Sequence, residues 1–329
     1  MKAIVINKPQ EVDIINIPKP SVGKEEVLLR ICHVGFCGSD LNTFRGSNAM
    51  VNYPRIPGHE IGGIIEDVGE KVPETLKKGC IVTVNPYTAC GHCDACKRSR
   101  FNACEHNETL GVQRDGAMTQ WIAIPWEKVI PCPNLTTQKA ALVEPMSVGF
   151  HAVRRGRVEK EDIVMVIGCG MVGLGAVAGA ALRGAKVIAA DLDEEKLSIA
   201  RKLGAGYVFN TSKPWPFDFE PDVVIEAVGS VPTYQLAVQQ VAFTGRIVCI
   251  GYAKTDVQLP TSLFVKKELD IMGSRNAEPQ DFEAVLDYVQ QHDISTFISK
   301  VIQPEEAAQA LAKWNDQPGK VFRILVDFE

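Results

Sequence analysis

The pattern of apolar and polar residues divides the sequence near residue 149. Before this point, short segments that alternate or run apolar are separated by Gly and Pro, as is typical of a mostly β domain. The strands expected there are residues 2–6, 12–17, 26–34, 62–68 and 80–84. After this point, strand-length apolar segments alternate with helix-length segments. This order predicts right-handed crossovers and a parallel sheet that is covered on both faces.

The second part of the pattern predicts individual elements of an α/β domain. Its expected strands are residues 163–167, 186–191, 207–209, 223–228, 246–250 and 269–272, and its expected helices are 170–182, 194–203 and 233–241. Residues 211–221 contain three prolines and little periodicity, so a loop is expected where another crossover helix would usually lie. After Pro279 the pattern predicts helices at 281–290 and 304–314 and a last strand at 321–327.

A glycine-rich turn directly follows the apolar strand Ile163–Ile167. Gly168 suits a tight turn, Gly170 allows the backbone to approach a pyrophosphate, and Gly173 lets a helix pack on the strand. The next strand ends at Asp191. In dinucleotide-binding folds, a carboxylate at this position accepts hydrogen bonds from the adenosine ribose. This spacing predicts a dinucleotide site that prefers NAD to NADP. The alternative is an ordinary strand, turn and helix in which Asp191 only caps a helix.

Length and composition limit the class of protein. A chain of 329 residues exceeds what one core normally sustains, so about two domains are expected. The net charge of −5 gives no general attraction to nucleic acid or to anionic lipid. The sequence has neither an apolar run of about 18 residues nor a signal-peptide pattern. We therefore expect a cytoplasmic protein with no nucleic-acid or membrane partner.

Four of the ten cysteines are crowded together as Cys90, Cys93, Cys96 and Cys104. This spacing suits one tetrahedral zinc ion, and four thiolates would close its coordination shell and leave no position for water. The expected role is therefore structural. The alternatives are buried thiols, disulfides or an iron–sulfur cluster, which also uses four cysteines.

A second set of metal-ligand side chains is scattered along the first part of the chain. It comprises Cys37, the neighbouring pair His59 and Glu60, and Glu144. Each is weak evidence alone, because a single His or Cys is usually a packed side chain. Together they offer thiolate, imidazole and carboxylate ligands, all of which zinc accepts, with room for an exchangeable partner.

Five motifs follow one another along nearly the whole chain. They are Cys37-Gly-Ser-Asp, Pro57-Gly-His-Glu, the four-cysteine cluster, the run from Ala141-Leu-Val-Glu-Pro to Gly156, and the glycine-rich turn. In this order they resemble the zinc-dependent medium-chain dehydrogenases. The resemblance is to the polyol (sorbitol) dehydrogenase branch and to bacterial sugar-acid dehydrogenases of the L-galactonate 5-dehydrogenase type.

The resemblance implies an α/β architecture of three segments. Residues 1–148 would form a mostly β, GroES-like catalytic domain with a structural-zinc lobe at about 86–106. Residues 149–277 would form a doubly wound Rossmann domain that binds NAD, and residues 278–329 would return to the catalytic domain. It also implies a cleft between the domains that holds zinc and nicotinamide. Pairing of the last sheet strand across a two-fold axis implies a homodimer or homotetramer.

The resemblance also assigns roles to the scattered residues. Cys37, His59 and Glu60 match ligands of a catalytic zinc, and Glu144 matches a carboxylate that either binds the metal or holds its water. The sequence does not decide between Glu60 and Glu144 as the direct ligand. Ser39 matches the hydroxyl that hydrogen-bonds the substrate oxygen and passes its proton outward. Two zinc ions per subunit are therefore expected.

Further cofactor contacts are expected at Met171, Val172, Gly251, Ser274 and Arg275. Arg275 matches an arginine near nicotinamide and substrate, although it could instead be a surface ion-pair residue. The chain departs from the family at Asn42, where the proton relay often has a histidine. An amide cannot accept and release a proton near neutral pH, so the proton would leave through water or a ribose hydroxyl.

The expected reaction is reversible oxidation of a secondary hydroxyl in a polyol, sugar or sugar acid. Zinc lowers the pKa of a bound water to about 7, and a bound alcohol should shift in the same direction. An adjacent NAD⁺ would then accept the hydride. The alternatives are an oxidoreductase for simple alcohols and aldehydes, or a catalytically idle sensor of nucleotide or sugar.

Overall fold

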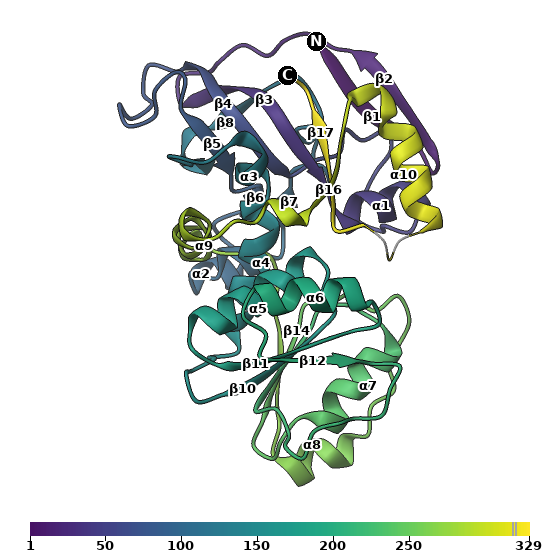
Figure 1. The fold of residues 1–329 in the computed structure, drawn as a ribbon. Coiled ribbons are helices and arrows are strands. Elements are labelled where there is room, and N and C mark those ends of the chain that lie inside the picture. Colours follow the sequence, from purple (N-terminus) through teal and green to yellow (C-terminus); the bar gives the residue numbers. More distant parts are fainter. Residues whose placement is uncertain (318, 320) are drawn as a thin grey trace. The chain divides into compact units, whose positions relative to one another are not determined.

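The computed structural model describes residues 1–317, 319 and 321–329, and it divides into two compact units (Figure 1). The first unit comprises Met1–Glu144 and Leu286–Glu329, and the second comprises Pro145–Val285. The chain passes from the first unit to the second within helix α4 (Val143–Arg155) and returns within helix α9 (Pro279–Gln291). Each unit has its own sheet and core.

The first unit is built on a seven-stranded sheet with the order β16-β17-β3-β4-β5-β9, in which β8 also pairs with β3. Its strands are β3 (Glu26–Phe36), β4 (Glu60–Val68), β5 (Ile81–Val84), β8 (Trp121–Pro125), β9 (Val129–Pro131), β16 (Ile298–Ile302) and β17 (Arg323–Asp327). The C-terminal strand β17 is antiparallel to β3, so the last strand of the chain joins the sheet built by its first 131 residues (Figure 1). This pairing is what brings Arg323 to the region around Phe36 and Glu60.

Short elements complete the first unit. Two-stranded sheets form from β1 (Lys2–Lys8) with β2 (Glu11–Asn16), and from β6 (Tyr87–Thr88) with β7 (Glu108–Thr109). The core is apolar and includes Ile4, Leu29, Phe36, Ile61 and Ile65. The helices are α1 (Gly38–Arg45), α2 (Asp94–Lys97), α3 (Thr137–Ala141) and α10 (Ala307–Asp316), and α3 packs against β3, β4 and β5.

The second unit is a doubly wound parallel sheet, which confirms the expected fold class. The strand order is β12-β11-β10-β13-β14-β15, so the order reverses between β10 and β13. The strands are β10 (Ile163–Ile167), β11 (Lys186–Asp191), β12 (Tyr207–Asn210), β13 (Val223–Glu226), β14 (Arg246–Cys249) and β15 (Asp270–Gly273). Helices α5 (Met171–Leu182) and α6 (Glu194–Lys202) cover one face, while α7 (Val231–Gln240) and α8 (Thr261–Lys267) cover the other (Figure 1). Ligands usually bind beyond the carboxyl ends of strands where such an order reverses.

Residues 211–221 form the loop that their prolines predict, since neither helix nor strand occurs there among the described residues. Aromatic side chains replace the missing helix as cover for the sheet. Trp215, Phe217 and Phe219 pack against the core of the second unit. Their rings lie in edge-to-face and stacked contacts, with centroids 5.0 Å apart for Trp215 and Phe217 and 5.2 Å apart for Phe217 and Phe219.

Five α-helices among the described residues have no counterpart in the sequence analysis, namely Gly38–Arg45, Asp94–Lys97, Thr137–Ala141, Val143–Arg155 and Thr261–Lys267. Four of them have eight residues or fewer, which is too short for clear helical periodicity. Helix α4 was missed although its polar residues, Glu144, Ser147, His151, Arg154 and Arg155, lie on one side, as in an amphipathic helix. The helix expected at 304–314 is instead a 3₁₀ turn, Pro304–Glu306, followed by α10.

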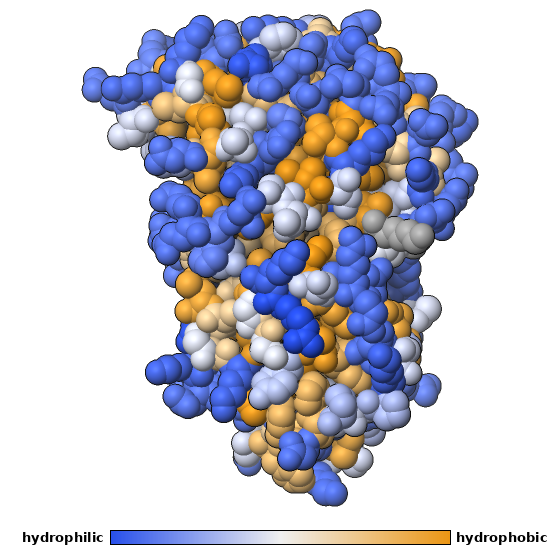
Figure 2. Space-filling view, viewed as in Figure 1, coloured by the Kyte–Doolittle hydropathy of each residue, from blue (hydrophilic) through white to orange (hydrophobic). Residues whose placement is uncertain are grey.

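The visible surface is mainly hydrophilic, with smaller apolar patches between the charged side chains (Figure 2). Among the described residues, no helix is both long enough and apolar enough to cross a membrane. The most exposed large apolar side chains belong to the second unit and are Leu182, Leu192, Phe243, Tyr252 and Val265.

Candidate functional site

Strand pairing in the first unit brings Cys37 and the pair His59 and Glu60 together. Glu60 begins β4 and is paired with Gly35 near the end of β3. A Cβ atom on Gly35 would lie 2.2 Å from Glu60 Oε2, so the glycine makes room for the carboxylate. Cys37, two residues after Gly35, is the N-cap of α1.

Cys37, His59 and Glu60 each place one potential ligand atom within 4.8 Å of the others. His59 and Glu60 are buried, and Cys37 is partly buried. Within the described part of the chain, His59 Nδ1 and Glu60 Oε1 have no hydrogen-bond partner, while Glu60 Oε2 lies 3.0 Å from Arg323 Nε. Burying a polar atom without a hydrogen-bond partner costs free energy, so such atoms usually have a partner. A metal ion bound by Cys37, His59 and Glu60 would supply that partner. Thiolate, imidazole and carboxylate together suit zinc.

The charges at this cluster favour an ionised thiol. Burial opposes ionisation of Cys37, but a hydrogen bond with His59 and its charge outweigh burial and lower the thiol pKa to about 7. Burial alone would lower the pKa of His59, but Cys37 and the buried Asp40 carboxylate raise it well above its usual value. A thiolate is the form of cysteine that binds metal.

Glu144 lies near this cluster but is not one of the three converging residues. Its carboxylate accepts a hydrogen bond from the Tyr87 hydroxyl, and both side chains are buried. Burial and the charge of Glu144 raise the pKa of Tyr87 well above its usual value, so Tyr87 remains a donor. The structure thus groups Glu60, rather than Glu144, with Cys37 and His59.

Three residues at this cluster had no assigned role in the sequence analysis: Asp40, Tyr87 and Arg323. Asp40 accepts a hydrogen bond from the Cys37 backbone N–H at 2.8 Å and fixes the start of α1. Arg323 Nε lies 3.0 Å from Glu60 Oε2, and its Nη1 donates to the Phe36 carbonyl at 2.6 Å. The only available signal for Arg323 was a charged residue at the start of the apolar run Ile324–Val326.

Ser39 follows Cys37 in the first turn of α1, and its Oγ has no hydrogen-bond partner among the residues the structure describes. Three residues later, Asn42 is partly buried, and its Oδ1 lies 3.4 Å from Ser47 Oγ. The hydroxyl is therefore available to a ligand, and the amide beside it carries no exchangeable proton near neutral pH.

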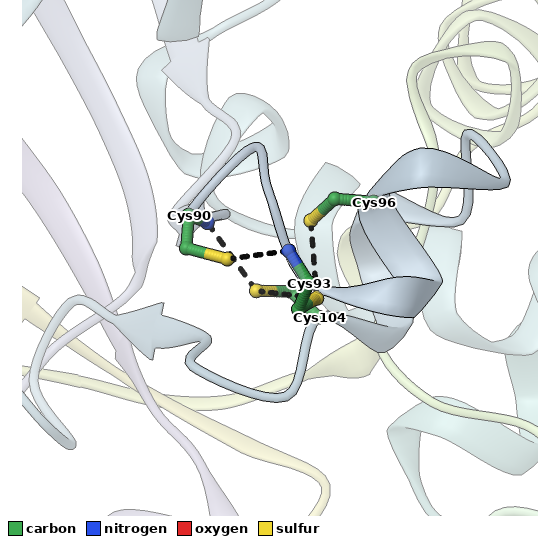
Figure 3. A group of neighbouring side chains, drawn as sticks. All are labelled: Cys90, Cys93, Cys96 and Cys104. Carbon is green, nitrogen blue, oxygen red and sulfur yellow. Dashed lines mark hydrogen bonds between the residues drawn. The ribbon is translucent and has the colours of Figure 1, made fainter.

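The four cysteines of the lobe come together as their spacing predicts (Figure 3). The Sγ atoms of Cys93 and Cys96 are 3.5 Å apart, and those of Cys93 and Cys104 are 3.9 Å apart. A disulfide requires about 2.05 Å, so these are not disulfides. Backbone N–H groups of Cys90 and Cys93 donate to neighbouring sulfurs, and such bonds stabilise thiolates. Four sulfurs in one cluster fit a closed zinc site.

A cavity of about 660 Å³ lies in the second unit beyond the carboxyl ends of the strands. Its walls include Gly168, Gly170 and Asp191, as the glycine turn predicts. Gly168 has a φ of +93°, and a Cβ on Gly173 would lie 1.7 Å from the Gly168 carbonyl oxygen. Both positions therefore require glycine. The volume lies in the range of ordinary ligand cavities.

The carboxylate of Asp191 is held at this cavity by two backbone amides. It accepts hydrogen bonds from Cys169 N at 2.7 Å and from Asp193 N at 3.0 Å. Lys196 lines the same cavity five residues after Asp191, and the sequence analysis did not single it out. The available signal for a cavity residue was that Lys196 lies in the first turn of α6, five residues after the Asp191 carboxylate.

Other expected cofactor residues lie outside the described lining of this cavity, namely Met171, Val172, Gly251, Ser274 and Arg275. Gly251 follows β14, and Ser274 and Arg275 follow β15. Ser274 is buried, and its Oγ has no hydrogen-bond partner within the described residues. Arg275 is partly buried rather than fully exposed.

Comparison with known proteins places both parts of the chain in known families. Residues 23–134 match the family model of the alcohol dehydrogenase GroES-like domain, and residues 171–291 match that of the zinc-binding dehydrogenases. The sequence is 34% identical to L-galactonate-5-dehydrogenase of Escherichia coli K12, over 87% of this chain and 86% of that protein. It is 35% identical to sorbitol dehydrogenase of Bacillus subtilis 168, over 83% and 81%.

A solved structure also resembles the whole chain. It is an Escherichia coli CFT073 protein described as a short chain alcohol dehydrogenase, in complex with NADH. The match has a TM-score of 0.91 and 28% sequence identity, and it covers 100% of this chain and 99% of the other.

Proposed function

The chain belongs to the zinc-type alcohol dehydrogenase family and is an oxidoreductase that acts on CH–OH groups with NAD, and we propose that its substrate is a polyol, sugar or sugar acid. A secondary hydroxyl would be oxidised reversibly to a ketone, with its hydride passing to NAD⁺ and its proton to solvent. The observation that carries this proposal is the convergence of Cys37, His59 and Glu60, three buried donors of different chemistry. The substrate class is supported by the similarity to L-galactonate-5-dehydrogenase and sorbitol dehydrogenase.

The first unit would supply the catalytic residues. Cys37, His59 and Glu60 would hold the zinc ion, which when bound supplies a Lewis acid that lowers the pKa of a hydroxyl. Glu144, bonded to Tyr87, would stay available as an alternative carboxylate. Ser39 Oγ would accept the hydrogen bond of the substrate hydroxyl and pass its proton to water, because Asn42 cannot take it.

The second unit would hold the cofactor. The amide groups at the start of α5, next to Gly168 and Gly170, suit the negative charge of a pyrophosphate. Asp191 would accept from the adenosine ribose, and Lys196, which lines the same cavity, would donate to it. Arg275, Ser274 and Gly251 remain proposed contacts of the nicotinamide half.

The four-cysteine lobe would hold a second zinc ion with a structural role. Cys90, Cys93, Cys96 and Cys104 would fill every coordination position. None of the ten cysteines forms a disulfide in the part of the chain that the structure describes. This supports a reducing, cytoplasmic setting.

Strand β15 suits assembly into a homodimer, or a homotetramer built from dimers. It is the last strand of its sheet, and Ile271 on it is 42% exposed. An exposed apolar edge strand is a ready surface for pairing with a second copy. Light scattering should give at least twice the mass of one chain, and a stable dilute monomer would refute this part of the proposal.

The reaction is tested by incubating the purified protein with zinc, NAD⁺ and a panel of polyols, sugars, sugar acids and simple alcohols. We expect absorbance at 340 nm to rise with at least one polyol, sugar or sugar acid, and His59→Ala to abolish that rise. A response only to simple alcohols would contradict the substrate class. A protein that binds NADH but oxidises none of these compounds would favour a sensor.

A further inference from the structure

A buried carboxylate stands beside the cofactor cavity without lining it. Glu226 ends β13, next to Ile167 of β10, at the point where the strand order reverses. Its exposed fraction is 0%. One oxygen, Oε1, accepts hydrogen bonds from Val228 N at 3.0 Å and from Gly229 N at 2.9 Å. The carboxylate therefore fixes the backbone of the turn that follows it.

That turn forms part of the cavity wall. Ala227, Val228 and Ser230 all line the cavity, and Ser230 is the N-cap of α7. The Val228 side chain packs so closely on the glycine turn that its Cγ2 would lie 2.5 Å from a Cβ on Gly168. The position of the turn is thus linked to the residues expected to bind the pyrophosphate.

The other side of the turn is equally constrained. Gly229 has a φ of +78°, and a Cβ there would lie 2.6 Å from the Tyr252 carbonyl oxygen. A Cβ on Gly251 would lie 2.1 Å from Gly229 N. The Glu226 backbone carbonyl accepts from the N–H groups of Ile250 and Gly251. Glu226 therefore holds both the turn that follows β13 and the turn that follows β14, and these two turns meet beside the cavity.

The free-energy cost of burying Glu226 argues against a purely structural role for this residue. Among the described residues, Glu226 Oε2 has no hydrogen-bond partner. A buried carboxylate with one unsatisfied oxygen is an unfavourable choice for stability, and such departures tend to occur at functional sites. Burial and the nearby Glu226 carboxylate also raise the pKa of the Cys249 thiol to about 11. Cys249 therefore adds no second negative charge beside Glu226 near neutral pH.

We propose that Glu226 is a positioning residue for the dinucleotide. By accepting from Val228 N and Gly229 N, it holds the wall formed by Ala227, Val228 and Ser230 in the shape that the cofactor requires. The inference rests on the proposed binding of NAD in this cavity. It assigns no direct contact between Glu226 and the cofactor.

The test measures NADH binding by fluorescence titration, which does not depend on the alcohol substrate. Glu226→Ala should raise the Kd for NADH at least about tenfold, because the two amides lose their acceptor. Glu226→Gln should stay within about twofold of the wild type, because its amide oxygen can accept the same two bonds. Val224→Ala, on the same strand, is the control: it removes buried apolar contacts and should lower Tm without changing Kd.

The outcomes separate this inference from the function on which it rests. If the wild type does not bind NADH, the cofactor assignment itself fails. If the wild type binds and Glu226→Ala binds equally well, or Val224→Ala weakens binding as much, the positioning role is overturned. A Gln variant as weak as the Ala variant would also overturn it. Should Glu226→Ala fail to fold, Glu226→Asp replaces it, since the shorter side chain withdraws the acceptor and should likewise weaken binding.

Discussion

Arg323 and Glu60 form a buried ion pair between the last strand of the chain and β4, with 3.0 Å between Nε and Oε2. Strand β3 lies between the two strands that carry them. Arg323 also donates to the carbonyl of Phe36, the residue before Cys37. Burial raises the pKa of the Glu60 carboxyl well above its usual value, and the charge of Arg323 offsets only part of that rise. Arg323 therefore supplies the positive charge beside Glu60 while holding the Cys37 loop in place.

Replacing Arg323 by Met should be strongly destabilising. Removing one partner leaves Glu60 as an unpaired buried charge, which costs about 3–5 kcal/mol. Urea unfolding should show this loss, and metal analysis should show weaker retention of one zinc ion. Arg157→Met is the matched control, because Arg157 and its partner Asp270 are 63% and 60% exposed. An exposed pair contributes at most about 1 kcal/mol. Equal losses in the two variants would contradict the special role of Arg323.

Loss of one lobe cysteine should remove one zinc ion but leave the other. Cys96→Ser breaks the four-sulfur set, and the zinc content of purified protein should fall from about two to about one per chain. Unfolding should shift to lower temperature, because structural zinc contributes directly to folding. Cys80→Ser lies outside the cluster and should keep both ions. A Cys96→Ser protein that still holds two ions would refute the structural site.

The sequence predicted the second unit well because its signals are local. Each strand is a short apolar run, and Gly168, Gly170 and Asp191 are separated by fixed distances along the chain. The grouping of Cys37 with His59 and Glu60 depends on adjacent strands; ligand chemistry suggested it weakly before the structure, and the family resemblance assigned the roles. Arg323 lies more than 250 residues from Glu60, and no local pattern links them. Helix α4 was missed although two usable signals were present, namely Pro145 in its first turn and polar residues on one side, from Glu144 to Arg155.

Asp191 should control the choice between NAD and NADP. Asp191→Ala removes the expected acceptor of the ribose hydroxyls and the negative charge that would repel a 2′-phosphate. We expect the Kd for NADH to rise about tenfold and the Kd for NADPH to fall. Fluorescence titration with both nucleotides measures the ratio directly.

Asp193→Ala is the control for the Asp191 variant. Asp193 is two residues away and caps α6 by accepting from Glu195 N at 2.8 Å and Lys196 N at 3.3 Å, but it does not line the described cavity. Its loss should cost about 1 kcal/mol of stability through the missing cap and leave the nucleotide ratio unchanged. If both variants change the ratio equally, Asp191 has no specific role.

The second unit contains a buried charge network whose stability should depend on pH. Asp281 accepts from Arg154 Nε at 2.8 Å and from Arg154 Nη2 at 2.9 Å, and it lies 2.8 Å from His151 Nδ1. His151, Glu278 and Asp281 offer enough ligand atoms for a metal, but Arg154 already supplies the positive charge there. Burial alone would raise the Asp281 pKa, but the bonds from Arg154 and His151 lower it to about 2.

The direction of the pH effect follows from this lowered pKa. Because the folded pKa lies below the unfolded value near 3.8, the pairing stabilises the fold fully above about pH 4 and loses that effect as pH falls toward 2. A shift of nearly two pKa units corresponds to about 2 kcal/mol. The difference in unfolding free energy between wild type and Asp281→Asn should therefore be largest at pH 5 and fall to about half by pH 3. Protonation of zinc ligands affects both proteins alike and cancels in this difference. Glu283→Gln, on the exposed side of α9, should show no such dependence. An Asp281→Asn difference that stays constant from pH 6 to pH 3 would mean that the carboxylate is not held ionised by Arg154.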